Sequence, residues 1–315
     1  MMMYVWLIVG FVLLVKGADF FVDGSSSVAK ILRVPSIIIG LTIVAFGTSC
    51  PEAAVSITAS IEGKNAISLG NVIGSNIFNL LVVTGASAVL MPITVDRGML
   101  KREFPFSIIV AVILLAFAAD TMLRGMETNA VGRGAGIVLL ILFVLFVAFM
   151  VWSALKNRTE SQEEYKTMSV TRSLIYIVGG LAAIIIGGQL VVDSATEIAR
   201  TFGLSETLIG LTIVAMGTSL PELVTSIVAA VKGESDLALG NVIGSNIFNI
   251  LLILGASATI APLSVGIEII YDTVILIVMS IVVYIMAFGK KKIGRLEGAI
   301  MLLGYAVYMA YIIMR

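Results

Sequence analysis

The feature that most constrains this chain is a long internal repeat. Residues 39–88 align without a gap with residues 209–258, and 32 of the 50 aligned residues are identical. The stretch from Gly70 to Asn79 recurs unchanged as Gly240 to Asn249. Chance likeness between apolar segments would match Val, Ile and Leu, but it would not reproduce Pro, Glu, Asn and Ser at fixed spacing. The repeat therefore predicts two related structural units in one chain.

The composition places both units in a lipid bilayer. Of 315 residues, 59% are hydrophobic and 13% are charged, and the mean hydropathy is +1.10. Such a chain cannot cover a soluble domain with polar side chains, and it is too apolar to be disordered. The net charge is zero, so no nucleic-acid partner is expected.

The residue types that are missing narrow the chemistry. Histidine is absent and Cys50 is the single cysteine, which removes the commonest zinc ligand, an intrachain disulfide and a thiol cluster. Neither an intramembrane enzyme nor a cofactor is therefore expected.

Ten apolar segments are candidates to cross the bilayer as helices. We expect an all-α polytopic membrane protein with spans near residues 4–24, 36–61, 67–91, 104–119, 134–155, 172–195, 206–231, 237–262, 269–288 and 296–314. The polar stretch 156–171 is predicted to link a first half, residues 1–155, to a second half, residues 172–315. The repeats occupy about residues 36–92 and 206–262 within these halves.

Five spans in each half is an odd number, so the second half must enter the membrane from the opposite side. The two halves are therefore predicted to be inverted relative to each other. Inverted repeats with broken helices and a site at the midplane recur in secondary transporters. A channel can also be built from inverted repeats, so this architecture favours transport without defining exchange.

The distribution of basic residues predicts the orientation. Fourteen of the 20 Lys and Arg residues lie in the loops after the odd-numbered spans, and five lie on the other side. Since cytoplasmic loops carry the excess of Lys and Arg, both termini are expected outside and the central linker in the cytoplasm. We expect a multi-pass protein of the cell (inner or plasma) membrane.

Spans 2 and 7 each contain a proline followed by a glutamate. Pro51 and Pro221 have no backbone N–H, so each helix is expected to break or kink there. The carbonyl groups of the preceding turn, around Ala45 to Gly47 and around Ala215 to Gly217, should then lose their helical partners. In hydrocarbon such a carbonyl must face a partner, a cavity or an ion.

Each broken span also places a carboxylate inside the membrane. Thr48 lies four residues before Glu52 on the same helix face, and Ser49 lies three residues before it. The second repeat carries the equivalent residues Thr218, Ser219 and Glu222. A carboxylate within a span is costly and marks a functional site, and the same segments hold no cation to pair with it.

Spans 3 and 8 are predicted to supply a second polar wall. Its members recur every four residues and are Asn71, Ser75 and Asn79 in span 3 and Asn241, Ser245 and Asn249 in span 8. Asn76 and Asn246 point away from this stripe and fit either helix–helix hydrogen bonding or a peripheral ligand position. Cys50 is expected to serve packing, because Leu220 takes its place in the second repeat.

Glycines in the same spans predict close helix packing. Gly70 and Gly74 form a G-x-x-x-G pair, and so do Gly240 and Gly244. Small residues at this spacing let helix backbones approach each other.

The proposed ligands are all hard oxygens from carboxylate, hydroxyl, amide and carbonyl groups. Such a set suits Na⁺, Ca²⁺ or Mg²⁺ rather than zinc or copper. Ca²⁺ accepts six to eight oxygens in irregular geometry, whereas Mg²⁺ holds its waters and requires a tighter octahedron. The pattern favours Ca²⁺, with Na⁺ as a competitor of similar size.

At these residues the sequence resembles the sodium/calcium exchanger family of the cation/calcium exchanger superfamily, in its compact prokaryotic form. The resemblance lies in the pairing of G-T-S-x-P-E with G-N-x-x-G-S-N in two α-repeats, Gly40 to Pro92 and Gly210 to Pro262. The ten-span plan extends it over the whole chain. Calcium/proton exchangers of the superfamily usually carry a more acidic repeat motif.

The resemblance implies a central Ca²⁺ held by Glu52 and Glu222, with help from Thr48 and Thr218. It implies flanking Na⁺ ligands at Ala45, Ser49, Glu52, Ser75, Ala215, Ser219, Glu222 and Ser245. Asn79 and Asn249 match the last central position of each repeat, where many relatives carry one acidic residue. The motif then holds two formal negative charges, and no potassium requirement is expected.

Moving two buried carboxylates between the two faces of the membrane is costly unless one Ca²⁺ or two or more Na⁺ neutralise them. The resemblance implies exchange of three Na⁺ for one Ca²⁺, Ca²⁺ export driven by Na⁺ entry, and spans 1 and 6 as sliding gates. Ca²⁺/H⁺ exchange, Na⁺ exchange for another divalent cation and a cation channel stay open as alternatives. The expected partners are the ions and the lipid bilayer, with no obligate protein partner.

Overall fold

The computed structural model describes residues 2–123, 130–156, 168–203 and 215–314, which are almost entirely helical. Among these residues, eight helices are long and apolar enough to cross a membrane, and one bent pair makes a ninth candidate. The predicted class, an all-α polytopic membrane protein, is confirmed. The predicted span 206–231 begins outside the described residues, so the count of ten stays a prediction.

The helices follow the predicted spans closely, with ends displaced by a few residues in most cases. The first half consists of α1 (Met2–Leu32), α2 (Ser36–Ile39), η1 (Gly40–Val44), α3 (Ala45–Thr48), α4 (Cys50–Ile61), α5 (Asn65–Phe78), η2 (Asn79–Val83), α6 (Thr84–Leu90), β1 (Ile93–Thr94), η3 (Met99–Glu103), α7 (Phe104–Leu123), β2 (Ala130–Val131) and α8 (Arg133–Lys156). The second half consists of α9 (Val170–Thr201), α11 (Ala215–Gly217), α12 (Leu220–Val231), α13 (Ser235–Phe248), η5 (Asn249–Leu254), α14 (Gly255–Ile260), β3 (Leu263–Ser264), α15 (Ile267–Lys290), β4 (Lys292–Ile293) and α16 (Arg295–Met314).

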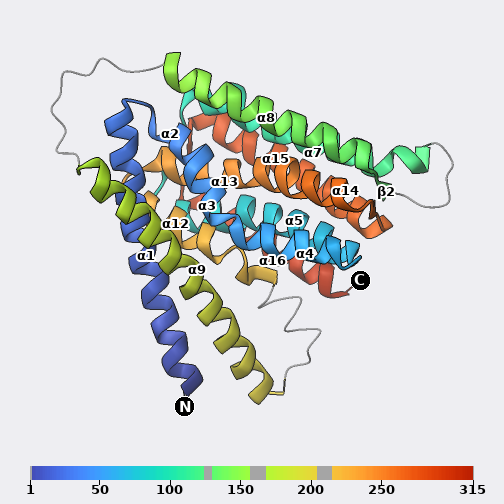
Figure 1. Cartoon of the computed structure of the whole chain (residues 1–315), viewed down its shortest axis with the longest axis horizontal. Helices are drawn as coiled ribbons and strands as arrows, with labels where there is room; N and C mark the ends of the chain where they lie inside the picture. The colour runs from blue at the N-terminus through green and yellow to red at the C-terminus, as the bar shows by residue number, and fades with distance from the viewer. Residues whose placement is uncertain (1, 124–129, 157–167, 204–214, 315) are drawn as a thin grey trace.

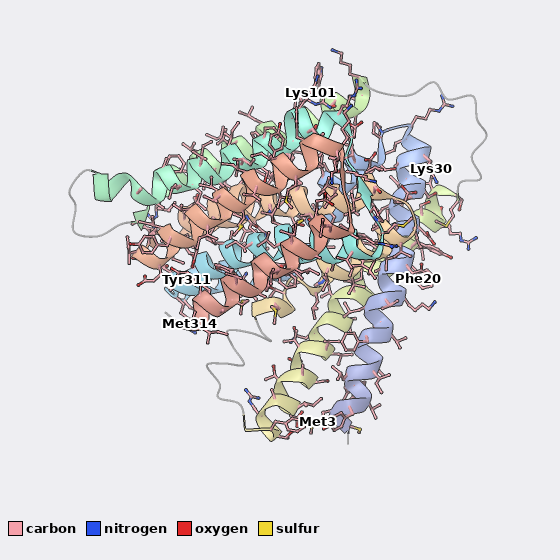
Figure 2. The ribbon with its side chains drawn as sticks, turned by 180° about the vertical axis from the view of Figure 1, so that it is seen from behind. Met3, Phe20, Lys30, Lys101, Tyr311 and Met314 are labelled. Atoms are coloured by element: carbon pink, nitrogen blue, oxygen red, sulfur yellow. The ribbon has the colours of Figure 1, made fainter. Side chains whose placement is uncertain are left out.

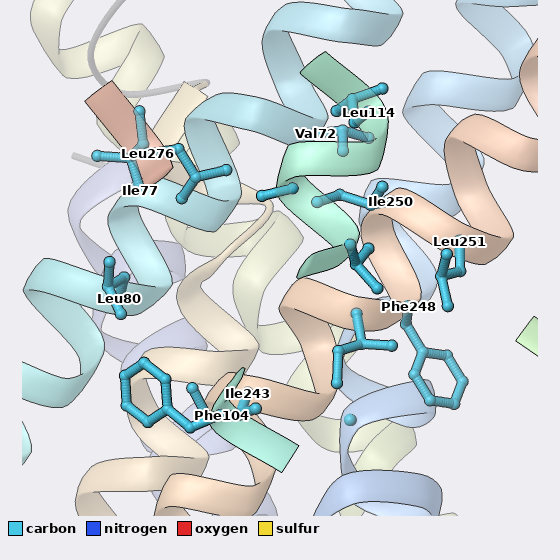
Figure 3. Close-up of a cluster of buried hydrophobic side chains, with 14 of the residues drawn as sticks. Val72, Ile77, Leu80, Phe104, Leu114, Ile243, Phe248, Ile250, Leu251 and Leu276 are labelled. Carbon is cyan, nitrogen blue, oxygen red and sulfur yellow. The ribbon is translucent and has the colours of Figure 1, made fainter. Parts of the chain in front are cut away.

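The two helices of the repeated Asn-rich stretch form the centre of the bundle. In the most apolar windows of the spans 65–90 and 235–260, 78% and 94% of the residues are buried, against 17–33% in the other long spans. Figure 3 shows side chains of α5, α13 and their neighbours meeting there, among them Val72, Ile243 and Leu276. In a bilayer such an interior is held by close van der Waals contact rather than by exclusion of water.

Helices α1 and α9 form a separate antiparallel pair, steeply inclined to the rest of the bundle (Figure 1). Their contact is built on a seven-residue spacing of glycines in α1. A Cβ added at Gly10 would lie 2.9 Å from the carbonyl oxygen of Gly187, and one at Gly17 would lie 2.8 Å from that of Gly180. Figure 2 follows α1 from Met3 to Lys30 along this flank. Equivalent helices that run antiparallel are what an inverted repeat requires.

Two short antiparallel strand pairs connect distant loops. Strand β1 pairs with β4, so that Ile93 lies opposite Ile293. Strand β2 pairs with β3, so that Val131 lies opposite Leu263. Each pair joins a loop of the first half to a loop of the second, which fixes the two halves against each other at the ends of the spans.

Candidate functional site

The break predicted in span 2 is present. The helices Ser36–Thr48 and Cys50–Ile61 meet at an angle of 50°, with Ser49 between them at φ −83° and ψ 6°. Pro51 stands in the first turn of α4, where its missing N–H costs no hydrogen bond. Glu52 consequently lies in that same first turn, where the helix dipole favours a negative charge.

The second repeat shows the same local structure where it is described. Helix α11 ends at Gly217, and α12 begins at Leu220 with Pro221 and Glu222 in its first turn. Ala215 opens α11, and the part of span 7 before it lies outside the described residues.

The expectation for the carbonyl of Ala45 was wrong. This carbonyl accepts the N–H of Ser49 at 3.1 Å, so it keeps a helical partner. The helix bends at Ser49, and the Ser49 N–H still bonds to the Ala45 carbonyl before the bend. The N–H that Pro51 lacks would have bonded to the carbonyl of Gly47, four residues earlier. The hydroxyl of Thr48 also lies 3.5 Å from the carbonyl oxygen of Ala45.

The two glutamates are connected across the repeats by a reciprocal pair of hydrogen bonds. The Ser49 hydroxyl donates to Oε1 of Glu222 at 3.0 Å, and the Ser219 hydroxyl donates to Oε1 of Glu52 at 3.0 Å. Both carboxylates are completely buried. Each broken helix therefore positions the carboxylate of the other, and the four side chains meet at the centre of the bundle.

The threonines of the motif contact the opposite asparagine stripe. The Thr48 hydroxyl lies 3.0 Å from Oδ1 of Asn241, and the Thr218 hydroxyl lies 3.4 Å from Oδ1 of Asn71. Asn71 in turn donates to the hydroxyl of Ser56 at 2.9 Å. These long-range contacts fix the break against the central helices.

The remaining predicted residues line the same centre, with unequal contacts. The Ser245 hydroxyl donates to Oε1 of Glu222 at 3.3 Å, whereas the hydroxyl of Ser75 has no hydrogen-bond partner among the described residues. Asn79 and Asn249 are completely buried. They begin the π-helices η2 and η5, a deviation frequent at functional sites that the sequence pattern does not disclose.

Several buried oxygens of the predicted site residues have no hydrogen-bond partner among the described residues. They are Oε2 of Glu52, Oε2 of Glu222, Oδ1 of Asn79, Oδ1 of Asn249 and the hydroxyl of Ser75. A buried carboxylate oxygen is costly unless a donor or a cation meets it. The described residues contain no cluster of three or more His, Cys, Asp and Glu side chains, so a bound cation would rely on hydroxyl and amide oxygens. Such a donor set fits Ca²⁺ or Na⁺.

A cavity of about 780 Å³ leads toward this centre along α9. Cys50, Thr218 and Pro221 line it beside the two breaks, and Asp193 and Glu197 line it from α9. Because α9 runs antiparallel to α1, these acidic residues lie toward the end of the bundle that holds the N-terminus. The cavity thus gives cations a route from one membrane face.

At the opposite face, α1 is joined to the turn after α12 by ion pairs that the sequence pattern did not predict. The Lys232 ammonium lies 2.6 Å from a carboxylate oxygen of Asp19 and 2.6 Å from one of Asp23. Partial burial lowers the pKa of Lys232, but the hydrogen bonds that its ammonium donates to Asp19 and Asp23 outweigh the burial and leave this pKa above its ordinary value. The lysine therefore stays charged at neutral pH.

The comparisons with known proteins agree with this geometry. The family model described as sodium/calcium exchanger protein matches residues 2–152 and 172–314. The chain belongs to the sodium/calcium exchanger family. Its members include a protein named sodium/calcium exchanger MaX1 from Methanosarcina acetivorans, which is 35% identical over 96% of both chains.

A second relative and a solved structure cover nearly the whole exchanger. An inner membrane protein of Escherichia coli, YrbG, is 36% identical over 96% of this chain and 94% of its own. A structure of the sodium–calcium exchanger NCX_Mj superposes with a TM-score of 0.84 at 34% identity over 98% of both chains. The exchanger described here is therefore a multi-pass membrane protein that transports cations by antiport, and its predicted fold class is confirmed.

Proposed function

We propose that this protein exchanges Na⁺ for Ca²⁺ across the membrane by alternating access, and that Na⁺ entry drives Ca²⁺ export. The observation that carries the proposal is the reciprocal bonding of Ser49 to Glu222 and of Ser219 to Glu52, both at 3.0 Å. It presents two carboxylates to one buried point while leaving Oε2 of each free of other partners among the described residues.

Ca²⁺ is bound between the two carboxylates in this proposal, with hydroxyl oxygens from Thr48 and Thr218. The Thr48 hydroxyl lies within hydrogen-bond distance of the Val44 and Ala45 carbonyls and of Oδ1 of Asn241, which are all acceptors for its one proton. The Thr218 hydroxyl donates to Oδ1 of Asn71. The lone pairs of both hydroxyl oxygens therefore stay available to a cation. Asn79 and Asn249 complete the lining with amide oxygens.

Na⁺ takes positions on either side of this centre. Its ligands are drawn from the carbonyls of Ala45 and Ala215, the hydroxyls of the Ser residues and the shared carboxylates, at Ser49, Glu52, Ser75, Ser219, Glu222 and Ser245. Because both glutamates serve Ca²⁺ and Na⁺, the two ions compete for the same charge, and occupancy by one excludes the other.

Charge neutralisation explains why exchange is coupled. With Asn rather than Asp at positions 79 and 249, the centre holds two negative charges. One Ca²⁺ or at least two Na⁺ cancel them, whereas the ion-free site would carry both charges through the low-dielectric interior. At three Na⁺ per Ca²⁺, one net charge moves in each cycle, which couples transport to membrane potential by about 2.3 kcal/mol per 100 mV.

Alternating access requires the α1–α9 pair to move against the central bundle. The contact between α1 and α9 is built on glycines at a regular spacing, so the pair can move as one body. The cavity along α9 gives access from the face on which the N-terminus lies, and sliding of the pair would close it and open the other face.

The direct test is ⁴⁵Ca²⁺ uptake into proteoliposomes loaded with sodium, with external sodium removed and pH clamped on both sides. We expect uptake that collapses when choline replaces internal sodium and that increases with a positive interior potential. Uptake that ignores sodium and follows a pH gradient would replace this proposal with Ca²⁺/H⁺ exchange. Conductance far above carrier rates without a counter-ion would replace it with a channel.

A further inference from the structure

Four asparagines lie at the contact between α5 and α13, and all are nearly or completely buried: Asn76, Asn79, Asn246 and Asn249. Two of them bond symmetrically across the repeats. The amide of Asn76 donates to the carbonyl oxygen of Asn246 at 3.1 Å, and the amide of Asn246 donates to the carbonyl oxygen of Asn76 at 3.2 Å. These bonds settle the role left open in the sequence in favour of helix–helix hydrogen bonding.

A third hydrogen bond breaks this symmetry. The side-chain amide of Asn249 donates to Oδ1 of Asn76 at 2.9 Å. The equivalent bond in the other repeat would run from the amide of Asn79 to Oδ1 of Asn246. It is not formed, and both of its atoms are buried without a hydrogen-bond partner among the described residues.

The sequence cannot be the cause of this difference, because Gly70 to Asn79 and Gly240 to Asn249 are identical residue by residue. The asymmetry therefore belongs to the conformation, in which a cavity runs along α9 to the breaks. In this conformation the amide of Asn249 is held on Asn76, whereas the carboxamide of Asn79 makes no hydrogen bond among the described residues.

We propose that Asn76 and Asn246 are positioning residues that act alternately. Asn76 orients the carboxamide of Asn249 while the cavity is open to the face of the N-terminus, and Asn246 orients that of Asn79 when the opposite face is open. The inference rests on the proposed function, since it assigns both carboxamides to the transported ion. At each switch one bond would break and the other would form, so that either Asn76 with Asn249 or Asn246 with Asn79 is hydrogen-bonded in each state.

If the two bonds exchange at each switch, variants of Asn76 and of Asn246 should change the KM for Ca²⁺ at opposite faces of the membrane. Asn76→Leu removes the acceptor of Asn249 and should raise the KM for Ca²⁺ about fivefold at the face of the N-terminus, the effect of losing one hydrogen bond. It should change the KM at the other face much less, because the bond from the Asn76 amide to the Asn246 carbonyl is lost in both states, whereas the bond to Asn249 is lost in one state only. Asn246→Leu should do the reverse.

The experiment measures ⁴⁵Ca²⁺ exchange in right-side-out and everted membrane vesicles, which expose one face each. Asn65→Leu, at the start of α5, is the matched control and should leave both KM values unchanged. If Asn76→Leu does not fold, Asn76→Ser serves instead, since its side chain is too short to reach Asn249. In the double variant Asn76→Leu with Asn249→Leu, KM should equal that of Asn249→Leu alone, because Asn76 acts through Asn249.

Equal KM shifts at both faces, a fall in maximal rate alone, or additive effects in the double variant would overturn the inference. Failure of the proposed function is a separate result, because it appears in the wild-type vesicles as uptake without sodium dependence. Failure of the inference appears only in the comparison of variants with a wild type that exchanges.

Discussion

Ser49 reaches Glu222 and Ser219 reaches Glu52 at the same distance of 3.0 Å, yet the turns that end the two broken spans make different contacts. In the first repeat, Glu62 and Lys64 flank Gly63 and pair with each other at 2.7 Å, exposed to solvent. In the second repeat the order of the charges is reversed, with Lys232 before Gly233 and Glu234 after it. Both residues form ion pairs with side chains of α1 instead of with each other.

This difference shows how nearly identical repeats can form a molecule with one open side. At the second turn, α1 is tied to the bundle through Asp19 and Asp23. At the corresponding place on α9 stand Gln189 and Asp193, which bond to each other at 2.8 Å and line the cavity. If the two halves are inverted repeats, as the sequence predicts, we expect exchange of these two arrangements to reverse the side that is open.

The largest effect on Ca²⁺ transport is expected at the two buried glutamates, which occupy equivalent positions in the repeats. Glu52→Gln and Glu222→Gln each remove half of the neutralising charge, and each should lower Ca²⁺ transport roughly hundredfold or more, because a buried charge arrangement is left incomplete. The measurement is sodium-dependent ⁴⁵Ca²⁺ uptake, with Glu62→Gln in the exposed turn as the control. Near-normal transport by one of the two variants would show that the carboxylates are not equivalent.

The tight packing of α13 can be tested through its glycines. A Cβ added at Gly244 would lie 2.7 Å from Cβ of Ala45, whereas one at Gly304 in α16 would meet nothing within 4 Å among the described residues. Gly244→Ala should destabilise the protein by about 1–3 kcal/mol through overpacking. Gly304→Ala should be neutral or stabilise it by up to about 1 kcal/mol, because alanine favours the helix.

Thermal unfolding of the purified protein in one detergent measures both glycine variants. Equal losses of stability in the two would contradict the tight packing of α13 at Gly244.

The ion pairs predict the smallest effect. Lys232→Gln removes the link between α1 and α12 and should weaken the conformation that is closed at that face, while Lys64→Gln should change nothing. Partly exposed pairs contribute about 0.2–1 kcal/mol each, so the ratio of the KM values at the two faces should shift about two- to fivefold. The shift should shrink at high ionic strength, since salt screens exposed charges. An identical shift in Lys64→Gln would contradict the distinction between the two turns.

The break in span 2 could be predicted because Pro and Glu act locally. Pro51 bends or breaks a helix, and a buried Glu52 needs polar neighbours, so the bend and the polar residues beside it could be predicted from the sequence. The carbonyl of Ala45 was missed because the position of the bend within one turn depends on neighbouring helices. The long-range partners of Thr48 and Thr218 depend on the packing of both halves and leave no local signal.

The difference between the repeats could not be predicted at all at identical residues. Gly240 and Gly244 show the predicted close approach of backbones, to Gly40 and Leu41. The segment equivalent to Gly40 and Leu41 in the second repeat lies outside the described residues, so the approach predicted for Gly70 and Gly74 stays a prediction. At the asparagines, one sequence makes two sets of contacts, so the local pattern cannot say which carboxamide is bonded. The charge exchange between Glu62 and Lys232 was visible in the alignment and was the one available signal.

The most direct test of the shared site is equilibrium binding of ⁴⁵Ca²⁺ to the purified protein across a series of Na⁺ concentrations. If both repeats contribute one carboxylate to a common centre, Na⁺ will displace Ca²⁺ completely, with a Hill coefficient above one, and both Glu52→Gln and Glu222→Gln will lose Ca²⁺ binding. Ca²⁺ that stays bound at saturating Na⁺, or that binds normally to either variant, would contradict a single site shared by the two ions.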